Sequence, residues 1–330
     1  MKKIIALLLA ALLTVSAGVC ALAEPVTLTD QVGREVTVEE VPSRIVSGYY
    51  ISSSALIALG VQDRIVGIEA KAAKRPIYSL SAPELIALPN VGSAKEFNLE
   101  GCIALKPDLV ILPKKLKDAA ATLSELGIPV LLVNPESQEN LEDMIALLGE
   151  ATGTEERAAE LLGYIDDLWD YLEEKLADTR KPRVYLAGNS NLLTTAGSKM
   201  YQSGMVTLAG AENVAADIED TYWAEVSYEQ LLKWNPDAIV LASDASYSVE
   251  DVLADENLAD CTAVKNGAVY NMPAGLEAWD SPVPSGVLGM LWLLATVHPD
   301  LYTKAECADY AANFYKTFYG FDMDKSIITG

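Results

Sequence analysis

An uninterrupted helical segment near the middle of the chain constrains the fold more than any other feature. Residues 154–180, TEERAAELLGYIDDLWDYLEEKLADTR, carry apolar residues at helical spacing and contain no proline. Glu155 and Glu156 suit the positive end of a helix, and Pro182 stops it from continuing. Because such a helix is long for one within a single globular domain, we predict a stiff strut that joins two lobes.

Short apolar runs alternate with helical or loop segments on both sides of this strut. RIVSGY, DRIVGI, PDLVIL and PVLLV precede it, and RVYLAG, AIVLAS and AVYNMP follow it. VTLTDQVGREVTV, before the first run, predicts an N-terminal hairpin. Strands that alternate with helices are typical of parallel sheets covered on both faces. The predicted fold class is therefore α/β, with two Rossmann-like lobes, each a central mainly parallel sheet with flanking helices, joined by one long rigid α-helix.

The first residues predict an export signal. Lys2 and Lys3 precede the apolar run IIALLLAALLTV and the small-residue pattern ALA, which ends at Ala23. This run is shorter than the roughly 20 apolar residues that a membrane-spanning helix needs. We expect cleavage after Ala23. A lipoprotein anchored at Cys20 is the less favoured alternative, because Val19 is bulkier than the small residue that normally precedes a lipidated cysteine.

These features predict four parts of the chain. They are a signal peptide at 1–23, an N-terminal α/β lobe at 24–153, the interlobe helix at 154–181 and a C-terminal α/β lobe at 182–330.

Charge and residue usage exclude several classes of partner and chemistry. The formal charge of −23 disfavours nucleic acid and anionic membranes. Cys102, Cys261 and Cys307 lie in apolar or helical stretches without CxxC spacing, so we expect buried free thiols. The single histidine, His298, argues against a site for bare zinc or manganese. No GxSxG, HExxH, Walker or GxGxxG pattern is present, so a secreted enzyme is a distant alternative and no cofactor is predicted.

One segment of the sequence nearly recurs. NLEGCIALKPDLVIL (98–112) and SYEQLLKWNPDAIVL (227–241) place Glu100 and Glu229 at matching positions before a Pro-Asp turn and an apolar run. An acidic side chain at a helix start is favoured by ~0.3–1 kcal/mol, which would explain either one alone. The matched spacing predicts that each lobe presents one carboxylate at the start of the equivalent helix. Such a pair suits a partner that is itself two-fold symmetric.

Over nearly the whole chain after Ala23, the sequence resembles the extracytoplasmic solute-binding proteins of iron-chelate and cobalamin ABC importers. The likeness is carried by TDQVGREVTVEEVPSRIVS, LGVQDRIVGI, VGSAKEFNLEGCIALKPDLVIL, LGIPVLLV, the long helix, RVYLAG, AGAENVA, WAEVSYEQLLKWNPDAIVL and VYNMP, in this order. The resemblance implies a ligand in the cleft between the lobes and only small hinge motion. It also implies a permease dimer with its ATPase subunits as the partner, and Glu100 and Glu229 as the permease-docking residues.

The candidate ligand contacts lie in loops at the carboxyl ends of the strands, where doubly wound sheets bind ligands. In the N-terminal lobe they are Tyr49, Tyr50, Lys71, Lys95 and Lys114, and in the C-terminal lobe they are Asn189, Tyr201, Trp223, Glu277 and Trp279. The same loops contain Lys74, Arg75, Lys115, Lys117, Asn191, Tyr222 and Asp280. The cations favour an anionic solute, although solvated loop lysines would give the same pattern. Trp223 and Trp279 would serve equally as packing anchors.

We therefore expect an exported, periplasmic or cell-surface, monomeric binding protein for a siderophore-like iron chelate. Haem, cobalamin and an oxyanion such as molybdate are the alternatives. At Lys71 the resemblance implies an aromatic residue in cobalamin-binding members, so this lysine disfavours cobalamin.

Overall fold

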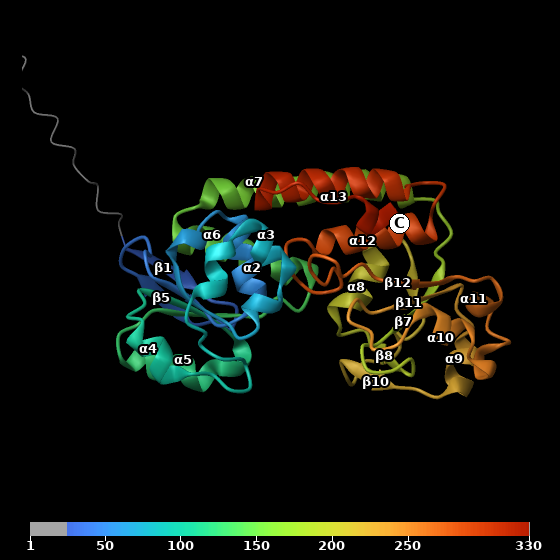
Figure 1. Cartoon of the computed structure of the whole chain (residues 1–330), viewed down its shortest axis with the longest axis horizontal. Coiled ribbons are helices and arrows are strands. Elements are labelled where there is room, and N and C mark those ends of the chain that lie inside the picture. The colour runs from blue at the N-terminus through green and yellow to red at the C-terminus, as the bar shows by residue number, and fades with distance from the viewer. Residues whose placement is uncertain (1–24, 330) are drawn as a thin grey trace, which may run out of the picture.

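The structure, a computed structural model, describes residues 25–329 and shows two α/β lobes under a pair of long helices (Figure 1). The predicted signal peptide and the Cys20 alternative lie outside the described residues. The predicted fold class is confirmed, since each lobe has a central, mainly parallel sheet with helices around it.

The N-terminal lobe is built on a parallel sheet with the strand order β4-β3-β5-β6. Its strands are β3 (Ile45–Ser47), β4 (Ile65–Ile68), β5 (Leu109–Pro113) and β6 (Val130–Val133). The helices are α2 (Tyr50–Ala58), α3 (Pro76–Ser81), α4 (Leu99–Ala104), α5 (Lys117–Glu125) and α6 (Gln138–Thr152). The strands are almost wholly buried, as the continuous apolar runs require. β1 (Val26–Thr29) and β2 (Glu35–Val38) form the predicted antiparallel hairpin.

The C-terminal lobe has the strand order β10-β8-β7-β11-β12, with β9 beside β7. Its strands are β7 (Arg183–Ala187), β8 (Thr194–Ala196), β9 (Glu212–Asn213), β10 (Trp223–Glu225), β11 (Ala238–Leu241) and β12 (Val269–Asn271). The helices are α8 (Tyr201–Leu208), α9 (Tyr228–Trp234), α10 (Val249–Leu253), α11 (Thr262–Lys265), α12 (Gly286–Val297), α13 (Lys304–Tyr319) and α14 (Ser326–Thr329). β7, β11 and β12 are parallel, whereas β8 is antiparallel to both β7 and β10.

The predicted strut is α7 (Glu155–Leu176), a helix of 22 residues that runs from one lobe to the other (Figure 1). Its buried face is Ala158, Leu161, Ile165, Leu168 and Leu172, which is the i, i+3, i+4 pattern of an amphipathic helix. The chain turns from α6 into α7 at Gly153, whose φ of +66° few other residues adopt.

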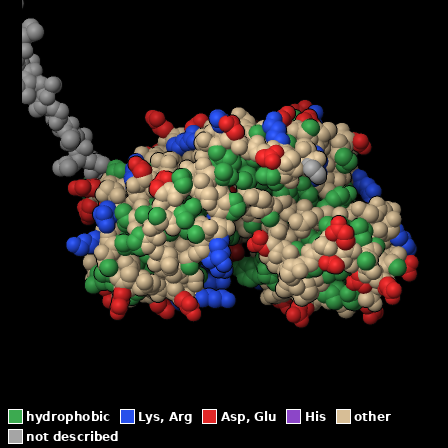
Figure 2. Space-filling view, in the orientation of Figure 1, with side chains coloured by type: hydrophobic (Ala, Val, Ile, Leu, Met, Phe, Trp, Pro, Cys, Tyr) green, Lys and Arg blue, Asp and Glu red, His purple; other side chains and the backbone are tan. Residues whose placement is uncertain are grey.

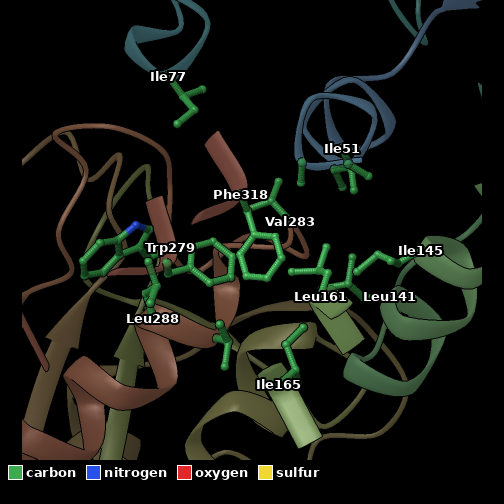
Figure 3. Close-up of a cluster of buried hydrophobic side chains, with 14 of the residues drawn as sticks. Ile51, Ile77, Leu141, Ile145, Leu161, Ile165, Trp279, Val283, Leu288 and Phe318 are labelled. Carbon is green, nitrogen blue, oxygen red and sulfur yellow. The ribbon is translucent and has the colours of Figure 1, made fainter. Parts of the chain in front are cut away.

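A second helix also connects the lobes, and the sequence did not indicate it. α13 lies beside α7 and reaches back to the N-terminal lobe, where it packs against α2 (Figure 1). Arg157 of α7 donates to Thr317 O of α13, and its guanidinium lies 4.6 Å from the centre of the Phe318 ring. One hydrophobic core therefore continues through both lobes, and Ile51, Leu161 and Phe318 are among its buried side chains in Figure 3.

The repeated segment has a structural role in each lobe. Asp108 accepts a hydrogen bond from Arg44 N at 2.8 Å, and Asp237 accepts one from Arg183 N at 2.8 Å. The Arg44 side chain also donates to Leu105 O at the end of α4, and the Arg183 side chain donates to Trp234 O at the end of α9. Each Asp thus ties its own strand to the neighbouring strand of the sheet. This explains the recurring Pro-Asp turn without reference to any partner.

Candidate functional site

A hollow lies between the lobes on the side away from α7 and α13 (Figure 2). On its C-terminal side is an open pocket of about 420 Å³. The lining residues come from the ends of β7, β8, β10 and β11, from α8 and from the loop before α12. They are Asn189, Ser190, Thr194, Met200, Gln202, Trp223, Asp244, Ala278, Asp280 and Ser281. A pocket of this volume suits a small organic molecule.

Trp223 forms one wall of the pocket because a glycine leaves room for its ring. A Cβ atom at Gly188 would lie 3.1 Å from Trp223 Cζ3 and 3.0 Å from Thr194 O. The indole can therefore lie across the end of β7, with 36% of the residue exposed. Of the predicted contacts in the C-terminal lobe, Trp223 and Asn189 are the two that line this pocket.

Two carboxylates line the same pocket. Asp280 is buried and accepts hydrogen bonds from the backbone N–H of Ser243, at 3.1 Å, and from its hydroxyl. Burial raises the pKa of Asp280, and these hydrogen bonds partly oppose the shift. Asp244 is exposed and lies close enough to raise the pKa of Asp280 further. The C-terminal wall is therefore acidic.

The N-terminal lobe places two tyrosines and an arginine opposite. Tyr49 and Tyr50 pack edge to face at 5.4 Å, at the start of α2. The Arg75 guanidinium lies 4.1 Å from the centre of the Tyr50 ring, and Arg75 Nε donates to Glu69 at 3.2 Å. Burial raises the pKa of Tyr50, a hydrogen bond with Ser281 and the charge of Arg75 lower it, and Asp280 raises it. Tyr50 thus lies between Arg75 and the acidic pocket.

The ion pair with Glu69 holds Arg75 in this position. The buried carboxylate of Glu69 also accepts hydrogen bonds from Ser53 Oγ at 2.6 Å and from Tyr78 OH at 2.9 Å. Burial raises the pKa of Glu69, while the Ser53 hydrogen bond and the Arg75 charge lower it. Arg75 is one of the loop cations of the sequence analysis but not one of its main candidates, because no local pattern in the sequence indicates that its guanidinium stacks on Tyr50 and pairs with Glu69.

Three predicted contacts lie in the interior between the lobes instead of on the pocket wall. Glu277 accepts hydrogen bonds from Ser54 Oγ of α2 at 2.7 Å and from Ser285 Oγ at 2.5 Å. Tyr201 OH donates to Gln138 of the N-terminal lobe at 3.1 Å. Trp279 is 1% exposed, and its Nε1 donates to Tyr315 OH at 2.8 Å. Its place is that of a packing anchor, the other role considered for it.

The three lysines of the prediction lie on loops of the N-terminal lobe. Lys71 and Lys95 are exposed, and Lys114 is half-buried just after β5. None of the three forms an ion pair among the described residues. Figure 2 shows basic side chains on the flank of the N-terminal lobe that borders the hollow. Their contact with a solute stays a prediction.

Glu100 and Glu229 occupy equivalent places in the two lobes. Each is exposed in the first turn of a short helix, α4 or α9. α4 leads into β5, which pairs with β3, and α9 leads into β11, which pairs with β7. Asn98 and Ser227 cap these helices by accepting from backbone N–H groups at 2.9 and 3.2 Å. Both helices lie on the side of the molecule away from α7 (Figure 1).

The described part of the chain was also considered for a metal site, for paired cysteines and for a membrane-spanning helix. Residues 25–329 contain no cluster of three or more His, Cys, Asp or Glu side chains suited to a metal ion. Cys102, Cys261 and Cys307 are buried free thiols, as predicted, and burial raises the pKa of Cys102 to about 11. Among the described helices, none combines the length and the apolar character needed to cross a membrane.

Comparison with known proteins places this geometry in a family. The family model described as periplasmic binding protein matches residues 45–276. The molybdate-binding protein MolA of Haemophilus influenzae is 28% identical over 344 residues, covering 96% of this chain and 97% of that protein. A vitamin B12-binding protein of Salmonella choleraesuis is 32% identical over 170 residues, covering 51% and 64%. A solved periplasmic solute binding protein of Veillonella parvula has a TM-score of 0.80 at 30% identity, covering 93% and 96%.

Proposed function

Since the chain belongs to the periplasmic binding protein family, we propose that it captures a siderophore-like iron chelate for an ABC importer. The chelate is held between the lobes and delivered to a permease dimer with its ATPase subunits. The family and the relatives are substrate-binding transport proteins, which confirms the predicted resemblance and the prediction that the chain is not an enzyme.

The observation that carries this proposal is the mixed character of the cleft. A pocket of about 420 Å³ offers an aromatic wall and convergent polar groups, and the other lobe holds a guanidinium 4.1 Å from the centre of the Tyr50 ring. This volume suits a chelate better than a tetrahedral oxyanion of a few atoms. Arg75 and the basic flank of the N-terminal lobe would attract the oxygen-rich part of such a complex.

Molybdate is the second candidate solute, because the match to the molybdate-binding protein MolA covers 96% of this chain. A thermal-shift screen with ferric siderophores, hemin, cyanocobalamin and sodium molybdate separates the candidates. A solute at 100 times its Kd stabilises the folded state by about 2.7 kcal/mol. We expect a ferric siderophore to give the largest shift. A shift with molybdate alone would support the solute-binding role but refute the iron chelate as the solute. The absence of a shift with every solute would count against the binding role and against the iron chelate.

Export and docking complete the proposal. The mature protein is a monomer that begins near Glu24, outside the cytoplasm, and intact-mass measurement of the exported form tests this start. Detection of an acylated chain that begins at Cys20 would instead show that the protein is a lipoprotein. Glu100 and Glu229 each pair with a basic pocket on one permease subunit, where a close interfacial ion pair couples by ~1.5–7 kcal/mol.

A further inference from the structure

The C-terminal wall of the cleft offers hydrogen-bond acceptors. Gln202 lines the pocket, and its Oε1 is buried without a hydrogen-bond partner among residues 25–329. Asp244 lines the same pocket with an exposed carboxylate, which has only acceptor oxygens when ionised. Asp280 adds a second carboxylate beside it. A solute that enters this pocket therefore meets two carboxylates, and the carbonyl oxygen of the lining residue Gln202 is buried and lacks a donor.

The N-terminal wall offers the opposite character. A guanidinium has five N–H donors and no acceptor. Arg75 uses its Nε to bind Glu69, and its other N–H groups have no acceptor within the part of the chain that the structure describes. Basic side chains gather on the same flank in Figure 2. The two walls thus differ in both charge and hydrogen-bonding direction.

This difference selects among solute chemistries. Molybdate carries negative charge and only acceptor oxygens, so the carboxylates would repel it and Gln202 Oε1 would stay unpaired. Hemin is disfavoured for the same reasons, because its polar groups are carboxylates. An organic molecule with an ammonium or amide N–H at one end and acceptor oxygens at the other satisfies both walls.

We infer that the cleft selects a two-ended organic solute or chelate, with donors toward Gln202 and Asp244 and acceptor oxygens toward Arg75. This assignment rests on the solute-binding function proposed above. It makes Gln202 and Asp244 specificity-determining residues and sets the orientation of the solute between the lobes.

The test compares probes with and without donors. Ferrioxamine B, which has an ammonium and amide N–H groups, and cyanocobalamin, which has amide side chains, are titrated by calorimetry beside sodium molybdate and hemin. We expect a donor-bearing probe to bind at least about 10-fold more tightly than either acceptor-only probe. Tighter binding of molybdate or hemin would overturn the inference and leave the solute-binding function standing. Absence of binding by both donor-bearing probes would also overturn it.

Variants then test the two residues. Gln202→Leu and Asp244→Asn should each weaken the tightest donor-bearing probe by about 10-fold, which corresponds to about 1.4 kcal/mol. Glu250→Gln, the same change of charge at an exposed residue of α10, should leave its affinity unchanged. The melting temperature of Gln202→Leu should not fall, because the variant removes a buried carbonyl that has no partner. Unchanged affinity in both pocket variants, or an equal loss in Glu250→Gln, would overturn the assignment.

Discussion

Removing the Glu277 carboxylate tests how the two lobes are joined. The residue is 9% exposed and accepts from Ser54 Oγ at 2.7 Å and from Ser285 Oγ at 2.5 Å. A hydrogen bond to a charged group contributes ~1.5–3 kcal/mol, but ionised Glu277 also bears the cost of burial. Ser54 keeps its 2.9 Å contact with Tyr319 in the absence of the carboxylate. We therefore expect Glu277→Ala to lower the free energy of unfolding by about 3 kcal/mol.

The pH dependence separates the charge of Glu277 from its shape. Burial raises its pKa above the usual 4.5, and the hydrogen bonds from Ser285 and Ser54 oppose this shift. Because the folded-state pKa exceeds the unfolded one, the resulting stability is fully present below the unfolded pKa. It is lost as the pH rises through the folded pKa. Glu277→Gln keeps the shape without the charge, so its stability relative to wild type should increase as the pH rises from 4.5 through that raised value.

Urea unfolding followed by circular dichroism, at a series of pH values, measures both effects. Ser54→Ala is the matched control, since it removes one donor and leaves the carboxylate paired with Ser285. It should cost about 1 kcal/mol. The reasoning is refuted if Glu277→Gln follows the wild-type pH profile, or if Glu277→Ala costs no more than Ser54→Ala.

Three further predictions concern solute and permease. Replacing Lys71, Lys95 and Lys114 together with Gln should weaken binding of a ferric siderophore and reduce its salt dependence in calorimetry; equal affinity would show that these lysines are only solvated. Gly188→Ala should displace Trp223, whose ring would lie 3.1 Å from the new Cβ, and weaken solute binding by roughly 10-fold, whereas unchanged calorimetric affinity would show that the ring does not form the wall. Glu100→Gln and Glu229→Gln should each reduce uptake in cells, and reduce it further together, with solute affinity retained and stability altered by only ~0.3–1 kcal/mol; normal transport by the double variant would contradict docking.

The main outline of the fold was predictable because it depends on local periodicity. The apolar stripe of α7 and the buried strands carry their pattern in the sequence, and the repeat at Glu100 and Glu229 marks equivalent helices in the two lobes. The return of α13 to the N-terminal lobe was not predictable. Its amphipathic pattern shows that one face is buried but does not say against which lobe.

The site was predictable as a set of loops but not as individual side chains. Trp223 and Asn189 line the pocket, whereas Glu277 and Trp279, from one neighbouring loop, turn into the interior between the lobes. Strand order places a loop at the carboxyl edge of a sheet, but the direction of each side chain depends on partners such as Ser54 and Tyr315 that are distant in sequence. Such partners have no local signal.

Native mass spectrometry with metal analysis tests the central claim most directly. The protein would be purified without denaturation from the extracytoplasmic fraction of its own cells, grown under iron limitation. The proposed function predicts a complex of one chain with one organic chelator and one iron atom. A complex that contains molybdenum and no iron, or a bound solute without any metal, would contradict the assignment of an iron chelate.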